Sequence, residues 1–231
     1  MSRIVLEAQN VTKIYRTGEV ETPAIVDVSL GIEHGEFSVL CGPSGSGKTT
    51  LLNQLGTLDR PTRGRIFVDG VDTTEMSEGD RSDLRLRKLG FVFQAYNLVP
   101  VLSAVENVEF VLLLQGVPAA ERRLRSLELL EELGLGDLAS KRPGQMSGGQ
   151  QQRVAVARAI ASNPELVLAD EPTANLDSKT AGALLDLMSL MNEERGVTFL
   201  FSTHDPRVMR RARRIISLSD GQIESDERRD S

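Results

Sequence analysis

The chain has 231 residues, which is enough for one sizeable hydrophobic core or for a main domain with a smaller subdomain, and too few for a large multidomain machine. Its 40% hydrophobic and 26% charged residues are ordinary for a globular protein and exclude the fibrous and disordered classes. The formal net charge of -6 disfavours nonspecific nucleic-acid binding, because phosphate contacts need a basic surface.

Cysteine usage and the apolar runs bear on the compartment. Cys41 is the only cysteine, so the chain forms no intrachain disulfide and a reducing compartment fits it best. Residues 1–15 carry dispersed charges and lack the apolar centre of a signal peptide. The apolar run at 110–114 is far shorter than the roughly 20 residues that cross a bilayer. We therefore expect a cytoplasmic protein that meets a membrane only through a partner.

The start of the chain combines extended segments with turn residues. Residues 4–8 and 24–32 are extended and are separated by a polar connection that contains Gly18 and Pro23. Because turn residues between two extended segments favour a reversal of direction, this pattern predicts an antiparallel β layer.

The next segments alternate strand-like and helix-like patterns. The apolar run 37–41 enters a glycine-rich turn, and residues 49–58 are compatible with a helix. The turn residues 60–64 predict that this helix ends before a short strand at 65–68.

In the rest of the chain the spacing of apolar residues changes twice. Apolar residues recur at helical spacing over 101–138, which predicts a helical insertion. The compact apolar runs 166–169 and 197–202 are typical of buried parallel strands whose C-terminal ends carry function. The charged residues 224–231 are expected to be frayed.

A glycine-rich stretch follows the apolar run 37–41 and fits the phosphate-loop pattern G-x-x-x-x-G-K-S/T. Glycines let backbone N–H groups converge on phosphate oxygens, and the start of a helix adds partial positive charge. The alternative, a flexible Gly/Ser turn, is disfavoured by four matching positions between a strand and a helix. The predicted nucleotide-binding residues are Gly42, Pro43, Ser44, Gly45, Ser46, Gly47, Lys48, Thr49 and Thr50.

Two side chains of this loop have distinct expected roles. Lys48 is expected to reach the β- and γ-phosphates and to act in catalysis. The Thr49 hydroxyl is expected to bind Mg²⁺, which neutralises charge on the transferring phosphoryl group.

An apolar run ends in two adjacent carboxylates, Asp170 and Glu171. Successive side chains at a strand end point in different directions, so the two need not share one task. We expect Asp170 to hold Mg²⁺ and Glu171 to polarise the attacking water. Alone, the pair is as consistent with solvated acids at a strand end.

A second glycine-rich turn follows Met146 and opens a helix with Ser147, Gly148, Gly149 and Gln150. Backbone N–H groups and a hydroxyl at a helix start bind anions, although an ordinary helix N-cap has the same residues. One nucleotide does not need two such loops from one chain.

Taken in order, these motifs closely resemble the ATP-binding-cassette ATPases, whose signature is Leu-Ser-Gly-Gly-Gln; Met146 in place of Leu is a mild departure. The resemblance covers 4–223. It implies an α/β fold: a P-loop NTPase core with a mixed central sheet, an N-terminal antiparallel β subdomain and an inserted α-helical subdomain. It also implies a single domain over 1–231, with the core at 1–93 and 154–223, the helical subdomain at about 94–153 and a disordered tail at 224–231.

In that family two cassettes pair head to tail, so that the signature of one subunit closes over ATP held by the other. The resemblance therefore implies ATP and Mg²⁺ as cofactors, ATP hydrolysis as the reaction and a second copy as a partner. It also implies integral membrane permease subunits on the inner face of the cell membrane. Nucleic acid is not an expected partner.

Four further residues match positions of the family. Tyr15 corresponds to an aromatic residue that stacks on adenine, and a packing role is the alternative. Gln94 corresponds to a glutamine that contacts Mg²⁺ and the attacking water and links the core to the helical subdomain. Asp177 matches a loop that runs between subunits, and His204 matches a histidine that contacts the γ-phosphate.

Three strings, at 56–62, 90–94 and 96–100, look like the cassettes of lipoprotein-releasing and macrolide-export systems and the related cell-division cassette. This branch, and a chain that ends soon after His204, favour export or extraction of lipoprotein, lipid or drug-like substrates. The alternatives are a mechanical or signalling cassette and, less favoured, a nucleic-acid-associated ATPase. The basic stretch 207–214 is interpreted as a solvated helix face.

Overall fold

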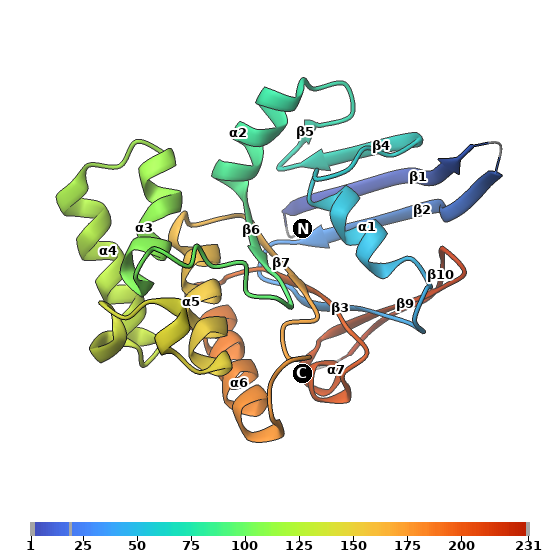
Figure 1. The fold of residues 1–231 in the computed structure, drawn as a ribbon. Helices are drawn as coiled ribbons and strands as arrows, with labels where there is room; N and C mark the ends of the chain where they lie inside the picture. Colours follow the sequence, from blue (N-terminus) through green and yellow to red (C-terminus); the bar gives the residue numbers. More distant parts are fainter. Residues whose placement is uncertain (1–2, 19, 230–231) are drawn as a thin grey trace.

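The computed structural model describes residues 3–18 and 20–229 and contains two β-sheets and several helices (Figure 1). In the described part of the chain the larger sheet has six strands in the order β10, β9, β3, β8, β7 and β6, and only β10 is antiparallel to its neighbour. The strand bounds are β3 (Phe37–Cys41), β6 (Leu89–Val92), β7 (Leu166–Asp170), β8 (Phe199–Ser202), β9 (Arg214–Ser219) and β10 (Gln222–Arg228). The expected mixed central sheet is confirmed.

The smaller sheet is antiparallel and has the order β2 (Val20–Glu33), β1 (Ile4–Thr17), β4 (Arg63–Val68) and β5 (Val71–Asp72). Its first two strands are longer than the predicted 4–8 and 24–32, because their pairing continues from Ile4 opposite Glu33 to Thr17 opposite Val20. Pro23 is tolerated because β2 lies at the edge of the sheet. The predicted antiparallel β layer is therefore present and longer than expected.

The central strands are buried on both faces. All five residues of β3 are buried, but Val39 and Leu40 belong to two different hydrophobic clusters, as expected for alternating side chains. Strands β7 and β8 divide in the same way, with Val167 and Leu168 in opposite clusters. The sheet therefore needs a cover on each face.

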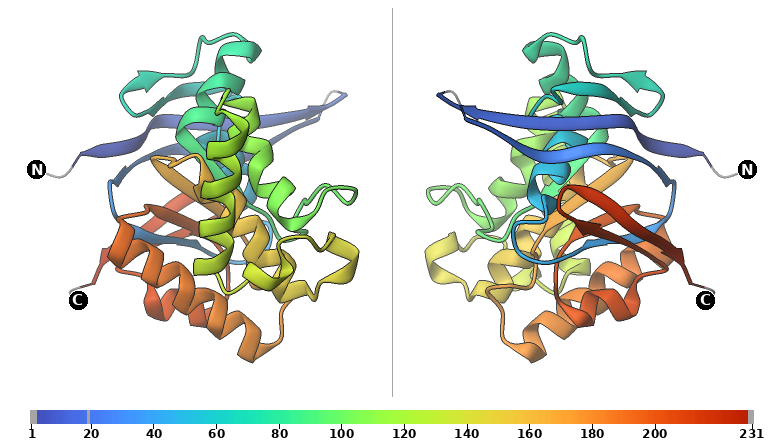
Figure 2. Two further views of the ribbon diagram at one scale, coloured as in Figure 1. Left: turned by 90° about the vertical axis from the view of Figure 1, so that its left-hand side faces the viewer. Right: turned by 90° about the vertical axis from the view of Figure 1, so that its right-hand side faces the viewer.

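Helix α1 (Lys48–Leu55) covers one face together with the antiparallel sheet. Leu51, Leu52 and Leu55 share a cluster with Leu40 of β3 and Val68 of β4. In both views of Figure 2 the blue strands of the antiparallel sheet lie above the red strands of the central sheet. The packing holds α1 between the two layers.

The opposite face is covered by helices from later in the chain. The predicted helical insertion contains α3 (Ala104–Leu114) and α4 (Ala119–Glu132), which pack on α5 (Gly148–Ala161). Buried residues of α6 (Ser178–Arg195) and α7 (Pro206–Arg211) join the same cluster. Helix α2 (Glu78–Lys88) precedes β6, and short 3-10 turns occupy Gly136–Leu138 and Pro143–Gln145. The predicted division into core and helical subdomain, with boundaries at 93 and 153, stays a prediction. Helix α5 crosses the second of these boundaries.

Two expectations for the end of the chain are wrong. Residues 224–228 are not a frayed tail but part of β10, because they pair in register with β9 from Ser217 to Arg214; residues 230 and 231 lie outside the described part of the chain. The basic stretch 207–214 is not a single solvated helix face. Helix α7 ends at Arg211, and Arg214 begins β9, where it is buried between Asp226 and Glu36.

None of the helices within residues 3–18 and 20–229 is both long enough and apolar enough to span a membrane.

Asn107 of α3 ties the preceding loop to the helical insertion. Its side chain is 1% exposed; Oδ1 accepts from the Val99 N–H at 2.7 Å, and Nδ2 donates to the carbonyl oxygens of Val99, Leu102 and Ser103. A buried polar side chain stabilises a fold when its hydrogen bonds are complete. Here one amide holds the connection between β6 and α3.

Replacing Asn107 by Leu is expected to lower the free energy of unfolding by about 2–3 kcal/mol, because buried backbone groups lose their partners. Urea denaturation followed by circular dichroism measures this loss. Glu128→Ala, at an exposed position of α4, is the control and is expected to change stability by less than about 0.5 kcal/mol. Equal stability of the Asn107→Leu variant and the wild type would refute the bracing role.

Candidate functional site

The predicted phosphate loop joins β3 to α1. Gly47 is the N-cap of α1 with φ of 100°, and no side chain among the described residues caps this helix. The N–H groups of its first turn are thus available to an anion, and the helix start adds partial positive charge. The local sequence produces this arrangement because an apolar strand, glycines and a helix follow each other directly.

Gly42 marks a close approach of two backbones. Its φ is 151°, and a Cβ at this position would lie 2.1 Å from the carbonyl oxygen of Leu218 in β9. At Gly45, where φ is 82°, a Cβ would have no atom within 4 Å. Both positions favour glycine, but only Gly42 is also limited by space.

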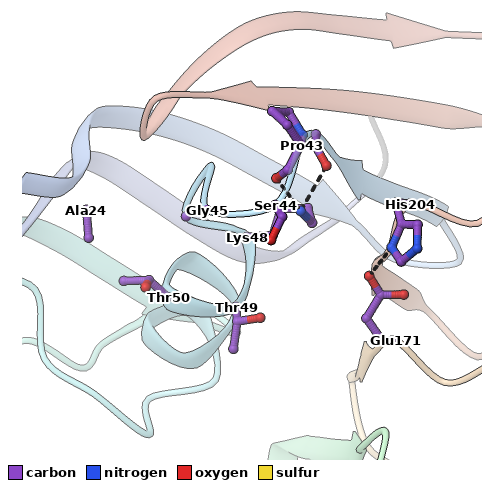
Figure 3. Close-up of a pocket in the computed structure, with 11 residues that line it drawn as sticks. Ala24, Pro43, Ser44, Gly45, Lys48, Thr49, Thr50, Glu171 and His204 are labelled. Carbon is purple, nitrogen blue, oxygen red and sulfur yellow. Dashed lines mark hydrogen bonds and ion pairs between the residues drawn. The ribbon is translucent and has the colours of Figure 1, made fainter. Parts of the chain in front are cut away.

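The Lys48 ammonium lies over the loop itself. Nζ donates to the carbonyl oxygens of Gly42 at 2.9 Å and Pro43 at 2.8 Å (Figure 3). The lysine charge is therefore held against carbonyl oxygens of the loop, at the edge of the pocket that Lys48 lines.

Thr49 and Asp170, two of the three residues predicted to bind Mg²⁺, lie next to each other. The Thr49 hydroxyl lies 3.4 Å from Oδ1 of Asp170, which ends β7. Burial raises the pKa of Asp170 above its ordinary value, and the bond from Thr49 opposes this only in part. A hydroxyl and one carboxylate fit Mg²⁺, which takes few protein ligands besides water and nucleotide phosphates. In the described part of the chain no cluster of three His, Cys, Asp or Glu side chains offers another metal site.

Glu171 and His204 come from adjacent strand ends. Asp170 of β7 lies opposite Ser202 of β8, so the residues that follow these strands meet at one edge of the sheet. His204 Nδ1 lies 2.7 Å from Glu171 Oε1, and the Thr203 hydroxyl donates to Glu171 Oε2 at 2.8 Å. The Glu171 side chain is 18% exposed and that of His204 77%. A carboxylate held on both oxygens has a defined direction.

The phosphate loop, the start of α1, Glu171 and His204 border one pocket of about 600 Å³, and the predicted Asp170 and Gln94 are not among the residues that line it. Figure 3 shows Lys48 and Thr49 on the loop and helix side and the Glu171–His204 pair opposite. Among the predicted residues, those that line it are Gly42, Pro43, Ser44, Gly45, Gly47, Lys48, Thr49, Thr50, Glu171 and His204. Ser46 is buried and does not line it. Ala24 of β2 does line it, and sequence reasoning missed this residue because only the sheet packing brings it there.

Tyr15 is not among the residues that line the pocket. Its side chain is partly exposed on β1, its hydroxyl lies 3.3 Å from Asp59 Oδ2, and Lys13 Nζ lies 5.1 Å from the ring centre. Lys13 also donates to Asp59 Oδ1 at 2.7 Å. The ring is therefore held by polar neighbours, and its stacking on adenine stays a prediction.

Gln94 follows β6 at the same sheet edge as the acidic pair, because Val92 lies opposite Ala169. Its carbonyl oxygen accepts from Asn175 Nδ2 at 3.0 Å. The turn after it is tied to α5, since Arg158 donates to the carbonyl oxygens of Tyr96 and Asn97. The structure thus links the predicted Gln94 region to the helix that starts at the signature.

The signature residues begin α5 and do not line the pocket. Ser147 Oγ accepts from the Gln150 N–H at 3.3 Å, and Gln150 Oε1 accepts from the Ser147 N–H at 2.8 Å, which is a capping box. In Figure 1 this helix lies on the helical side of the molecule, away from α1. The chain therefore carries two glycine-rich helix starts that do not share a pocket.

Asp177 is the N-cap of α6. Oδ1 accepts from the N–H groups of Lys179 and Thr180, both at 3.0 Å, and the bonds from Thr180 lower the carboxyl pKa. Helix capping by itself therefore accounts for an aspartate at this position. Its predicted place in a loop between subunits is compatible with that cap and is not tested by it.

Alanine at Gly42 and alanine at Gly45 are expected to differ in cost. Gly45→Ala should lower the free energy of unfolding by about 1–2 kcal/mol through its positive φ alone. Gly42→Ala should cost about 2 kcal/mol more, because its Cβ meets the Leu218 carbonyl. Denaturant unfolding without nucleotide measures both free energies. Equal losses for the two variants would contradict the close approach of Gly42 to the Leu218 carbonyl.

Comparisons with known proteins agree with this geometry. The family model described as ABC transporter matches residues 25–174. The lipoprotein-releasing system ATP-binding protein LolD of Anaeromyxobacter dehalogenans is 47% identical over 222 residues, which are 96% of this chain and 93% of LolD. The macrolide export ATP-binding/permease protein MacB of Syntrophobacter fumaroxidans is 49% identical over 224 residues, or 96% of this chain, which spans 31% of that longer protein.

The fold has a close solved counterpart. A dimeric structure of the ATP-binding cassette MJ0796, in a post-hydrolysis state with ADP and Pi, superposes with a TM-score of 0.90. The two chains are 45% identical, and the match covers 98% of this chain and 99% of the other. A curated relative of the same name comes from Methanocaldococcus jannaschii. With its phosphate loop, acidic strand end and signature in order, the chain belongs to the ABC transporter family as an ATP-binding subunit that hydrolyses ATP.

Proposed function

We propose that two copies of this chain bind two ATP·Mg²⁺ between them and that their closure drives a membrane permease. The observation that carries the proposal is the separation of the two glycine-rich helix starts: the start of α1 lines the pocket, and the start of α5 does not. A head-to-tail pair would place the Ser147–Gly149 turn of one copy over the nucleotide of the other. The dimeric assembly of MJ0796 supports this arrangement.

In this scheme the predicted site residues have distinct tasks. The loop from Gly42 to Thr49 binds the phosphates through its N–H groups, and Lys48 carries positive charge to the β- and γ-phosphates. Thr49, Asp170 and Gln94 hold Mg²⁺, which when bound offsets the negative charge of the transferring phosphoryl group. Tyr15 stacks on adenine.

Glu171 accepts the proton of the attacking water. Its carboxylate is oriented by Thr203 and by His204, which contacts the γ-phosphate from the same strand edge. Hydrolysis removes the γ-phosphate that joins the two copies, so the closed pair reopens.

A second cavity is suited to the permease. It has a volume of about 370 Å³ and lies between the core and the helical insertion. Its wall is mainly apolar and includes Leu58, Phe91 and Phe93 of the core side and Phe110 and Leu114 of α3. An exposed apolar hollow of this kind fits a segment of a partner protein. The MacB relative, whose ATP-binding and permease parts form one protein, supports a permease as that partner.

Motion in the nucleotide pocket can reach this cavity through Arg158. Arg158 lines the cavity, and its guanidinium donates to the turn that follows Gln94.

A permease as partner would hold the chain at the inner face of the cell membrane. The LolD and MacB relatives favour export or extraction of lipoprotein, lipid or drug-like substrates.

Replacing Glu171 by Gln is expected to preserve ATP binding and to lower turnover by about 100-fold or more, because the water loses its proton acceptor. Steady-state phosphate release measures turnover, and gel filtration with ATP should show an accumulated dimer. Glu193→Gln, at an exposed position of α6, is the control. Wild-type turnover by the Glu171 variant would remove this residue from its role.

Phe110→Glu is expected to abolish co-purification of the permease, because a carboxylate in the apolar cavity opposes docking. The tagged chain is purified from detergent-solubilised membranes and its partners are identified by mass spectrometry. Leu124→Glu, at an exposed position of α4 outside the cavity, should retain the partner. Recovery of only water-soluble proteins by the wild type would overturn the permease proposal.

A further inference from the structure

Two turns at the edge of the central sheet are joined by reciprocal hydrogen bonds. The Thr203 hydroxyl, after β8, donates to Oε2 of Glu171, after β7, at 2.8 Å. In the opposite direction, the Thr173 hydroxyl donates to Oδ2 of Asp205, also at 2.8 Å. Each turn therefore supplies one hydroxyl and one carboxylate to the other.

The direction of the Thr203 hydroxyl is fixed by its surroundings. The residue is fully buried, and its backbone N–H donates to the Leu40 carbonyl of β3 at 3.1 Å. Its Oγ1 accepts from the Asp205 N–H at 3.1 Å. With that N–H on the oxygen lone pair, the hydroxyl proton points to Glu171.

The Thr173–Asp205 bond stabilises the turn that presents Thr203 and His204. Thr173 is 1% exposed, and Asp205 also accepts from the backbone and side chain of Arg207. Although burial alone would raise it, these hydrogen bonds lower the Asp205 pKa to about 2. The carboxylate is thus charged throughout the physiological range and a constant partner for Thr173.

Glu171 needs such support. Its φ is 44°, in the left-handed region that non-glycine residues rarely adopt, and its other oxygen faces the exposed His204 ring. Of the two groups that contact the carboxylate, only Thr203 is buried and fixed by further hydrogen bonds. A general base acts well only when its lone pair is directed at the water.

We propose that Thr203 is a positioning residue that holds the Glu171 carboxylate in its reactive orientation, and that the Thr173–Asp205 bond keeps the Thr203 turn in place. The proposal rests on the proposed role of Glu171 as the proton acceptor. It assigns no contact with ATP to Thr203.

The first test removes the hydroxyl alone. Thr203→Val should lower kcat roughly 10-fold to 100-fold, the usual effect of one hydrogen bond to a charged group, and change KM for ATP by less than about threefold. Thr203→Ser, which restores the hydroxyl, should recover kcat to within about threefold of wild type. Thr203→Ala differs from the serine variant only in the hydroxyl and repeats the comparison if valine does not fold.

A matched control loses a buried hydroxyl elsewhere. Thr73 is 4% exposed in the antiparallel layer, and its hydroxyl donates to the Ile66 carbonyl at 2.9 Å. Thr73→Val is expected to reduce stability but to leave kcat within about twofold of wild type. A similar loss of kcat in both valine variants would mean that Thr203 acts only on stability.

The second test separates this proposal from the role of Glu171. In the Glu171→Gln background, Thr203→Val should cause no further loss of single-turnover rate, because both changes act through one carboxylate. An inactive Glu171→Gln with a fully active Thr203→Val would overturn the positioning role and leave the proposed function standing. An additional loss in the double variant would show that Thr203 acts independently of Glu171, and an active Glu171→Gln would overturn both claims.

Discussion

The structure depends on a parallel sheet that must be covered on both faces. Strands β3, β7 and β8 have no solvent-facing side, and their alternating side chains enter two separate hydrophobic clusters. The antiparallel layer with α1 satisfies one face, and the later helices satisfy the other. Because parallel strands place their carboxyl ends together, this burial also gathers the phosphate loop, Glu171 and His204 at one edge.

At that edge, rigidity comes from hydrogen bonds between turns rather than from apolar packing. Glu171 has an unfavourable φ that the local sequence does not support. Two hydrogen bonds connect the turns after β7 and β8, from Thr203 to Glu171 and from Thr173 to Asp205. In each bond the two residues are 32 positions apart in the chain. Such tertiary bonds let a strained backbone persist where chemistry requires it.

The same sheet edge is connected to the helical insertion. Arg158 of α5 reaches back to the turn after Gln94, and Asn107 holds the segment that follows this turn. Polar contacts of Arg158 and Asn107 therefore connect this edge of the sheet to α5 and α3. In the proposed dimer, α5 also presents its Ser147 turn to the other copy, so one helix would join the partner's nucleotide to the apolar cavity that Arg158 lines.

The amino-acid sequence was enough to predict the phosphate loop, the acidic strand end, the signature turn and the mixed α/β class. These features are local, because each needs only neighbouring residues with the right conformational preferences and spacing. It did not predict β10, the burial of Arg214, the place of Ala24 in the pocket or the threonines that hold the two turns together. Arg214 pairs with Glu36, which is 178 residues away in the sequence. Thr203 can donate to Glu171 only when β7 and β8 pair in register. These points depended on long-range packing, because the groups that contact each of these residues lie far away along the chain.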